Sequence, residues 1–310
     1  MTSPLSPVLT ALVAVAALAG CASASTPGAE PARSATAASA TFAAPSADSS
    51  ATARTRVTKL LVFVVENHSI DQMQSGMPWL SALADRYGYA TRYHAITHPS
   101  LPNYLAIAGG DTYGITDDNP PSSHVIREPS VFGSALRAGR TATTYAEGMT
   151  SRCQQDNAGE YAVRHNPWTY FRSEHRLCRH HDVGLGHLRR DVDAGTLPRV
   201  GLVVPDVCND AHDCSLGTAD AWLQQHVGEV LDGPDFASGH LAVVVTADED
   251  DTHHGNRVLT VVANPSLDGV VVNRALTHYA LSRSLAEAAG IDPIAHAADA
   301  RSLLRAFGLR

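Results

Sequence analysis

The chain has 310 residues, of which 44% are hydrophobic and 17% charged, and its formal net charge is −8. A negative balance without a basic cluster argues against a nucleic-acid partner and gives no support to binding of anionic surfaces. The length suits one α/β domain of about 255 residues behind an N-terminal extension.

Residues 1–21 form an uncharged apolar stretch that ends in small residues and Cys21. The stretch is too short and too rich in alanine for a transmembrane helix, which needs about 20 strongly apolar residues, so we interpret it as an export signal. Leu18-Ala19-Gly20-Cys21 resembles a bacterial lipobox. That resemblance implies that Cys21 is lipidated and is the only membrane attachment; the alternative is a signal peptide cut near residues 22–24. Either interpretation places the protein outside the cytoplasm, lipid-anchored or secreted.

Residues 22–56 consist mainly of Ala, Ser, Thr, Pro and Gly. Such a composition buries too little apolar surface to offset the entropy of ordering, so we expect a disordered tether. The folded domain is then residues 57–310, which we expect to be monomeric.

Strand-like and helix-like segments alternate along this domain. Residues 60–65 and 241–245 are continuous β-branched and apolar runs, as expected of strands buried on both faces of a parallel sheet. The other predicted strands are 89–94, 141–145, 200–204 and 258–262, and the predicted helices are 79–87, 102–108, 131–138, 219–231, 276–289 and 297–307. Residues 151–190 form a polar, cysteine-bearing insertion. The pattern predicts an α/β fold with a mostly parallel central sheet and helices on both faces.

Acidic and amide side chains directly follow two of the buried strands. Glu66 and Asn67 follow the first strand, and Asp248 and Glu249 follow the late one. Ligands in open α/β sheets bind beyond the carboxyl ends of the strands, and oxygen donors suit Mg²⁺, Ca²⁺ or Mn²⁺. We therefore expect one divalent metal ion, Mg, Ca, Mn or Zn. The alternatives are a helix cap at residues 66–67 and a solvated acidic turn at residues 248–251.

Ser100 lies between two prolines at the start of the helix predicted at residues 102–108. Backbone N–H groups at a helix N-terminus favour an anionic phosphoryl group, and a metal-bound hydroxyl is an activated nucleophile. We expect Ser100 to be both nucleophile and metal ligand, with Asn67 or Asn103 donating to the phosphoryl group. The acid for the leaving alcohol should be a histidine. The candidates are His165, His212, His253 and His254; His98 we expect only to orient the serine loop.

Four cysteines remain when Cys21 is set aside. An even number in an exported chain predicts disulfides, and four cysteines allow three pairings. We favour Cys153 with Cys178 and Cys208 with Cys214, because each pair closes a local loop rich in Gly, Asp and Asn. A zinc site is the alternative, but no C-x-x-C pair is present.

The ordered set of motifs resembles the phosphoesterase family that contains acid phosphatases and phospholipases C, within the alkaline phosphatase superfamily. The motifs are Glu66-Asn67-His68-Ser69-Ile70-Asp71, Pro99-Ser100-Leu101-Pro102-Asn103, Tyr145-Ala146-Glu147-Gly148-Met149, His165-Asn166-Pro167, Pro205-Asp206-Val207-Cys208-Asn209-Asp210 with His212-Asp213-Cys214, Thr246-Ala247-Asp248-Glu249, and Thr277-His278-Tyr279-Ala280-Leu281.

The resemblance implies an alkaline phosphatase-like three-layer sandwich and a phosphoserine formed at Ser100. It also implies that Glu66, Asn67, Asp248 and Glu249 hold the metal and the phosphoryl group. His165, His212 and His254 would serve catalysis, and His253 would contact the substrate.

The leading hypothesis is an acid phosphatase-like phosphomonoesterase acting on small phosphate esters. A phosphodiesterase or phospholipase C is the second hypothesis, although the chain is short for a phospholipase C. A sulfatase is less consistent, because Tyr104 stands where the arginine of its C/S-x-P-x-R pattern would be. A non-catalytic surface lipoprotein that binds anions or glycans is the fourth.

Overall fold

The structure is a computed structural model that describes residues 56–309. All of these residues belong to one compact unit, Thr52–Arg310. The predicted signal peptide, Cys21 and the tether up to residue 55 lie outside the described residues.

The strands, in chain order, are β1 (Lys59–Val65), β2 (Gly88–Ala90), β3 (Tyr93–His94), β4 (Ala142–Ala146), β5 (Asp182–Gly184), β6 (Val200–Val204), β7 (Leu241–Ala247), β8 (Thr260–Ala263), β9 (Val270–Val272) and β10 (Leu276–Thr277). Eight of them form one sheet in the order β5-β4-β6-β1-β7-β8-β2-β9, and β10 pairs with β3 in a small second sheet. Every neighbouring pair in the large sheet is parallel except those that involve β8. The sheet is therefore mostly parallel, as predicted.

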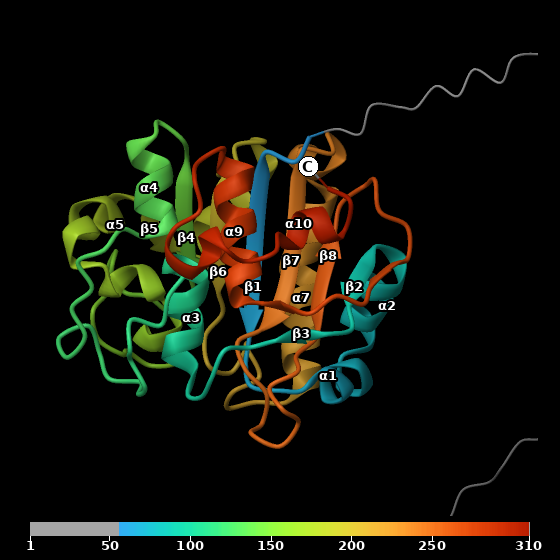
Figure 1. Ribbon diagram of the computed structural model, residues 1–310, viewed down its shortest axis with the longest axis horizontal. Coiled ribbons are helices and arrows are strands. Elements are labelled where there is room, and N and C mark those ends of the chain that lie inside the picture. The colour runs from blue at the N-terminus through green and yellow to red at the C-terminus, as the bar shows by residue number, and fades with distance from the viewer. Residues whose placement is uncertain (1–55, 310) are drawn as a thin grey trace, which may run out of the picture. The chain divides into compact units, whose positions relative to one another are not determined.

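The helices, in chain order, are α1 (Ile70–Gly76), α2 (Pro78–Arg86), α3 (Ser100–Gly109), α4 (Val131–Arg137), α5 (His175–His181), α6 (Gly186–Asp193), α7 (Leu216–Asp232), α8 (Pro234–Ala237), α9 (His278–Ala289) and α10 (Leu303–Ala306). Four 3₁₀ turns accompany them: η1 (Val163–His165), η2 (Pro167–Tyr170), η3 (Arg172–Glu174) and η4 (Ala295–Ala298). α3, α4, α9 and α10 pack together on one side of the sheet, and α1, α2, α6, α7 and α8 pack together on the other (Figure 1). This confirms the layered α/β architecture.

The central strands are continuous apolar runs because helices cover both of their faces. Every residue of β6 and β7 is buried, and so are six of the seven residues of β1. β1 lies between β6 and β7, and Val65 at its end pairs with Ala247. The next residues along the two strands are Glu66 and Asp248, so this register brings their acids together at the carboxyl edge of the sheet.

Several element predictions were wrong in detail. The strand predicted at 89–94 is two short strands, because the chain turns at Thr91 and enters the second sheet at Tyr93. The helix predicted at 297–307 is a 3₁₀ turn followed by α10, since the Ser302 hydroxyl caps a new helix by accepting from the Arg305 amide. α1 was not predicted, although Ser69 and Gln72 form a capping box at its start.

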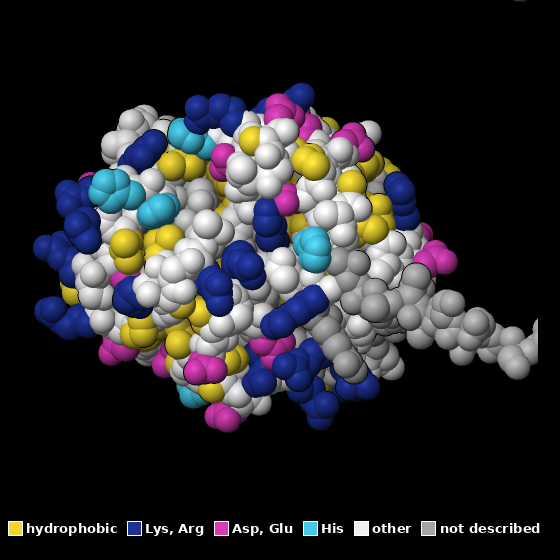
Figure 2. All heavy atoms as spheres, turned by 90° about the horizontal axis from the view of Figure 1, so that it is seen from above, with side chains coloured by type: hydrophobic (Ala, Val, Ile, Leu, Met, Phe, Trp, Pro, Cys, Tyr) yellow, Lys and Arg dark blue, Asp and Glu magenta, His cyan; other side chains and the backbone are white. Residues whose placement is uncertain are grey.

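The amino ends of the central strands lie opposite the acidic edge. Figure 2, seen from above, looks onto this amino-terminal side, where Lys and Arg side chains are spread over the surface. The carboxyl ends of β1 and β7, which those acids directly follow, lie at the lower edge in Figure 1, away from the side seen in Figure 2. Within residues 56–309, no helix is long and apolar enough to cross a membrane.

Candidate active site

The Ser100 hydroxyl and the Glu66 carboxylate form the centre of the site. Glu66 is the first residue after β1, and Ser100 is the first residue of α3. Ser100 Oγ donates to Glu66 Oε2 at 3.0 Å, and the Tyr104 hydroxyl donates to Glu66 Oε1 at 2.7 Å. Ser100 and Tyr104 are four residues apart on one helix, so they share a face and reach the same carboxylate. All three side chains are buried.

The acids that follow β7 lie on the other side of Ser100. Both carboxylate oxygens of Asp248 are buried without a regular hydrogen bond in the described part of the chain, although the Ser100 hydroxyl lies close enough to act on its pKa. Glu249 Oε2 accepts from Asn103 Nδ2 at 3.2 Å and lies 3.1 Å from His98 Nδ1. The predicted acids and the serine therefore belong to one buried cluster.

The loop after β6 and the 3₁₀ turn η1 contribute a third group of site residues. His165 Nε2 lies 3.3 Å from Glu66 Oε1, and His165 Nδ1 lies 3.0 Å from Asp210 Oδ2. The His165 ring stacks on Tyr104, with centroids 5.1 Å apart and planes 12° apart. The backbone ties the same parts together, because the Glu66 amide donates to the Asp210 carbonyl at 2.7 Å.

Burial controls the protonation of these groups. Burial raises the pKa of Asp248 well above its ordinary value, and the neighbouring charges of Glu66 and Glu249 raise it further. Burial likewise raises the pKa of Glu66, raises that of Glu249 to about 8 and raises that of Asp210 to about 7. Burial lowers the pKa of His165 to about 4, although Glu66 opposes this change. The pocket therefore holds more carboxylate than its own cations neutralise.

The donor set fits a hard divalent cation. Glu66, Asp248 and Glu249 supply carboxylate oxygens in one buried cluster, and neither oxygen of Asp248 makes a regular hydrogen bond with the described residues. A cation between them would offset both desolvation and mutual repulsion. Among the described residues, the site group whose ligand atoms all lie within 4.8 Å of one another is Glu66, His165 and Asp210, whereas Glu66, Asp248 and Glu249 together do not meet that distance.

The predicted site residues do not all meet. Ser100, Glu66, Asn103, Asp248, Glu249 and His165 form one cluster. Asn67 is half-buried beside it and makes no side-chain hydrogen bond with the described residues. His212 lies at the margin, its ring centroid 6.1 Å from that of His165. His253 and His254 lie exposed on the loop after β7, where His254 pairs with Asp251 at 2.6 Å.

Four further residues of the site were not singled out from the sequence. Tyr104 and Asp210 contact Glu66 and His165 as described, and Arg164 and Asp118 lie beside them. Tyr104 could have been found, because it follows Ser100 by one helical turn. Asp210 lay within a recognised motif. No sequence signal separates Arg164 or Asp118 from other charged residues.

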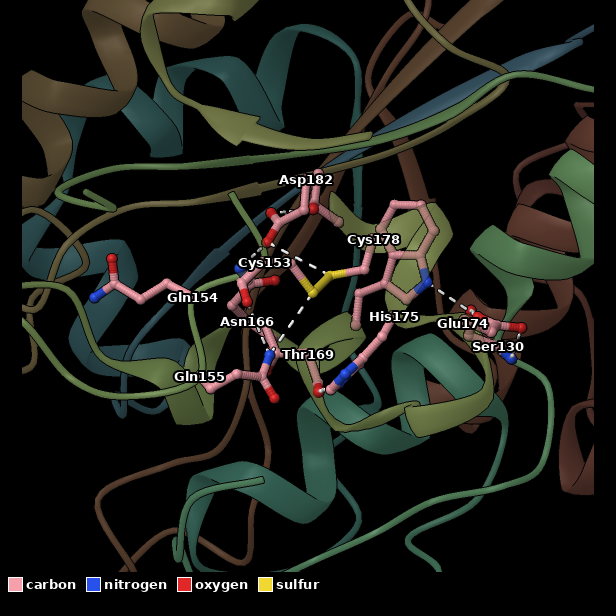
Figure 3. The surroundings of a disulfide bond; sticks show 12 residues. Ser130, Cys153, Gln154, Gln155, Asn166, Thr169, Glu174, His175, Cys178 and Asp182 are labelled. Atoms are coloured by element: carbon pink, nitrogen blue, oxygen red, sulfur yellow. Dashed lines mark hydrogen bonds between the residues drawn. A yellow bond between two sulfur atoms is a disulfide. The ribbon is translucent and has the colours of Figure 1, made fainter. Parts of the chain in front are cut away.

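Both predicted disulfides are present, Cys153–Cys178 and Cys208–Cys214. The second closes the loop that carries Asp210 and His212. The first lies against Asp182, whose carboxylate accepts from Asn166 Nδ2 at 2.9 Å (Figure 3). The same carboxylate also accepts from the Thr144 hydroxyl. Asn166 directly follows His165, so this buried network supports the wall of the site.

Two cavities lie elsewhere on the molecule. One of 440 Å³ is lined by residues such as Glu147, Arg189 and His226, and one of 250 Å³ by residues that include Arg274 and Arg301. No predicted site residue lines either of them.

Comparison with known proteins identifies the family of this chain. The model of the phosphoesterase family matches residues 71–288. Phosphatidylinositol-3-phosphatase of Mycobacterium tuberculosis is 28% identical over 255 residues, which cover 80% of this chain and 82% of that protein. A probable acid phosphatase of Kluyveromyces lactis is 29% identical over 227 residues, or 69% of this chain and 52% of that protein. The chain thus spans about half the length of this second relative.

Solved structures agree on the fold. A protein in the alkaline phosphatase superfamily from Vibrio parahaemolyticus superposes with a TM-score of 0.55 at 11% identity, over 81% of this chain and 70% of that chain. A phosphonate monoester hydrolase from Silicibacter pomeroyi gives a TM-score of 0.51 at 13% identity, over 82% and 77%. At such identities the likeness shows the fold alone. The family match extends across most of the domain and contains Ser100, His165, Asp210, Asp248 and Glu249, so this chain belongs to the phosphoesterase family, and its class of activity is phosphoester hydrolysis.

Proposed function

We propose that the protein is a metal-dependent phosphomonoesterase that uses Ser100 as its nucleophile. The observation that carries this proposal is the hydrogen bond of 3.0 Å between Ser100 Oγ and Glu66 Oε2, close to the buried carboxylate of Asp248. A serine hydroxyl is a weak nucleophile until a base or a cation activates it. The pocket brings suitable groups to that one oxygen.

In the proposed reaction, Ser100 Oγ forms a bond to phosphorus while the bond from phosphorus to the leaving oxygen breaks. Glu66 Oε2 accepts the hydroxyl proton as this bond forms, and it directs the oxygen of Ser100 towards the ester. Tyr104 fixes the Glu66 carboxylate from the other side. Water then hydrolyses the phosphoserine and releases phosphate, so the net reaction consumes one water.

The cation would be held by Glu66, Asp248 and Glu249, with Asn67 and Ser100 beside them. When bound, a divalent ion lowers the pKa of the serine hydroxyl and screens the charge of the ester. Asn103 is the candidate donor to a phosphoryl oxygen, and its side-chain amide already holds the loop that leads to Ser100. Its Oδ1 accepts from the Ile96 and Thr97 amides at 2.9 and 3.2 Å, and its Nδ2 reaches Glu249.

The leaving alcohol needs a proton, and histidine is the natural donor. His165 and His212 both lie where η1 meets the Cys208–Cys214 loop. Burial lowers the pKa of His165 to about 4, and its two ring nitrogens face Glu66 and Asp210, so we assign His165 to positioning these carboxylates. His253 and His254 would have to be brought in by movement of their exposed loop. We therefore propose His212 as the acid.

The substrates that we propose are small phosphate monoesters. The named activity of the mycobacterial relative supports this choice, because the 3-phosphate of phosphatidylinositol 3-phosphate is a monoester. Because the name of that relative specifies a lipid substrate, a monoester carried on a lipid should be compared with a soluble monoester. Diesters and phospholipids such as phosphatidylcholine represent the second hypothesis.

Two disulfides in one domain support an oxidising compartment. We accordingly propose that the protein acts outside the cytoplasm, secreted or anchored through Cys21, as a monomer. Labelling of the expressed protein with a fatty-acid analogue, beside Cys21→Ser, tests the anchor.

The test of function is hydrolysis of an aryl phosphate monoester by the purified protein, with and without a chelator and beside Ser100→Ala. We expect at least a thousandfold loss of kcat in the variant and loss of turnover with the chelator that added Mg²⁺, Ca²⁺, Mn²⁺ or Zn²⁺ restores. A matched control is Ser173→Ala, an exposed serine on η3. Turnover that survives in Ser100→Ala rejects the nucleophile, and faster turnover of a bis-aryl diester or of phosphatidylcholine selects the second hypothesis.

A further inference from the structure

Arg164 has unused hydrogen-bonding capacity at the margin of the site. Its Nη2 lies 3.2 Å from His212 Nε2, the only hydrogen bond that its guanidinium makes with residues 56–309. A guanidinium carries five donors, so most of them have no protein acceptor. The side chain is nevertheless only 18% exposed. These free donors can therefore receive an anionic ligand.

Asp118 faces the same place with the opposite charge. Its Oδ1 accepts from the Leu101 amide at 2.9 Å, and its Oδ2 lies 3.9 Å from Arg164 Nε. The Leu101 amide belongs to the first turn of α3, where N–H groups lack partners within the helix. Asp118 thus accepts from the Leu101 amide, which directly follows Ser100, and lies close to the Arg164 guanidinium.

The charges of Arg164 and Asp118 shift the pKa values of residues in the site. The Asp118 charge raises the pKa of Glu249, and the Arg164 charge lowers it. Arg164 lowers the pKa of Asp210 and His165 as well. These pKa shifts agree with the contacts to His212 and Leu101. Arg164 and Asp118 lie next to the reacting groups rather than on a separate surface.

We propose that Arg164 binds the phosphoryl group of the substrate and that Asp118 competes with that group for Arg164 and for the Leu101 amide. This inference rests on the proposed function and adds a residue that selects phosphate monoesters. Arginine binds phosphate oxygens in a bidentate manner, and its charge does not titrate in the physiological range. Because a monoester carries close to two negative charges at neutral pH and a diester carries one, Arg164 stabilises the monoester more.

A purely structural role for Arg164 would act through His212. Arginine can only donate, so His212 Nε2 accepts from it and His212 Nδ1 donates to Asp213 Oδ1 at 2.7 Å. If Arg164 did no more than orient this ring, Arg164→Gln and His212→Gln would have equal effects, and the double variant would be no worse than either. A phosphoryl ligand predicts losses that add.

The experiment measures inhibition by inorganic phosphate, and kcat/KM for an aryl monoester and a bis-aryl diester, in the full protein. Arg164→Gln should weaken phosphate inhibition and monoester kcat/KM by about 10- to 100-fold, and affect the diester by less than about threefold. Arg164→Lys should recover part of the loss, and Asp118→Asn should strengthen phosphate inhibition. The control is Arg189→Gln, an exposed arginine on α6 that pairs with Asp193 and Glu229.

Unchanged phosphate inhibition in Arg164→Gln, or effects identical to His212→Gln, overturns the inference. Circular dichroism checks that each variant is folded. If Arg164→Gln is unfolded, phosphate inhibition of Arg164→Lys provides the test. Failure of the proposed function looks different, since the parent would then hydrolyse no monoester at all. In that event, calorimetric titration of Ser100→Ala with phosphate, with and without Arg164→Gln, still decides whether Arg164 binds the anion.

Discussion

The Ser100 hydroxyl lies 3.0 Å from the Glu66 carboxylate, although 34 residues separate the two in sequence. They meet because Glu66 ends a central strand at the carboxyl edge of the sheet and Ser100 begins the helix that packs above this edge. The register of β1 with β7 adds Asp248 to the pair. The position of the reacting oxygen is therefore fixed by backbone elements rather than by a flexible loop.

Tyr104 acts as a positioning residue for Glu66. Tyr104→Phe keeps the ring that stacks on His165 and removes only the hydroxyl that donates to Glu66 at 2.7 Å. A hydrogen bond to a charged group contributes about 1.5 kcal/mol or more, so we expect kcat to fall about tenfold. KM should stay within about twofold, because Tyr104 does not touch the ester. Steady-state kinetics of the phenylalanine variant check this; an unchanged kcat would show that Glu66 needs no such support.

His165 should matter far more than His254. His165 is buried between Glu66 and Asp210, whereas the His254 side chain is 43% exposed and pairs with Asp251 on the loop after β7. We expect His165→Gln to lower kcat/KM by about 100-fold or more and His254→Gln to lower it by less than about threefold. His180→Gln, an exposed histidine on α5, serves as the matched surface control. A large loss in His254→Gln would mean that this loop closes over the substrate.

Loss of one disulfide should mainly lower the free energy of unfolding, and loss of the other should mainly lower kcat. Cys208–Cys214 spans a sequence separation of 6 and Cys153–Cys178 one of 25. Chain-entropy arguments predict that loss of the short bridge costs about 2 kcal/mol of unfolding free energy and loss of the long one about 3.5 kcal/mol. The short bridge, however, fixes the loop that carries Asp210 and His212. Replacing both of its cysteines by serine should therefore lower kcat more than about tenfold at temperatures where the protein stays folded.

Urea titrations and initial rates on the two double-serine variants check this order. Equal activity of the two variants at low temperature would contradict the assigned role of the short loop.

Asp182 should make the domain less stable as the pH rises from about 4 to 6. Burial raises the pKa of this carboxyl group to about 6, from an ordinary value of 3.8. Between these values the folded protein binds more protons than the unfolded one, so the free energy of unfolding falls with rising pH by up to about 3 kcal/mol and then levels off.

Asp182→Asn removes this titration and keeps the shape of the side chain. Its amide oxygen can still accept from Asn166 Nδ2, and its amide nitrogen can donate to the Thr144 hydroxyl (Figure 3). We expect the stability difference in favour of the asparagine variant to grow across this pH window, measured by urea unfolding. A difference that is constant with pH would show that Asp182 does not carry the buried charge.

The sheet and the acids at its edge could be predicted because one physical rule produces both. Strands buried on two faces require continuous apolar runs, and the residues that follow such runs in a parallel sheet lie at a common edge. Glu66, Asp248 and Glu249 were found in this way. The antiparallel course of β8 could not be found, since its Thr-Val-Val-Ala sequence would suit either direction.

The partners of the catalytic groups depend on contacts that sequence does not encode locally. His165 and His254 look alike in the chain, and only the packing of η1 against α3 buries the first. Arg164 and Asp118 meet across a sequence separation of 46, and their importance lies in the free donors and the shared helix terminus. The predicted strand at 89–94 failed for a similar reason, because the chain leaves one sheet for another within it.

The most direct test of the account is the identity of the residue that carries the phosphoryl group during turnover. The purified protein is mixed with an aryl phosphate, quenched in acid within milliseconds and mapped by mass spectrometry, with Ser100→Ala treated in parallel. The account predicts a phosphoryl group on the peptide that contains Ser100 and none in the alanine variant. A phosphoryl group on another residue, or sustained turnover by the alanine variant, would contradict it.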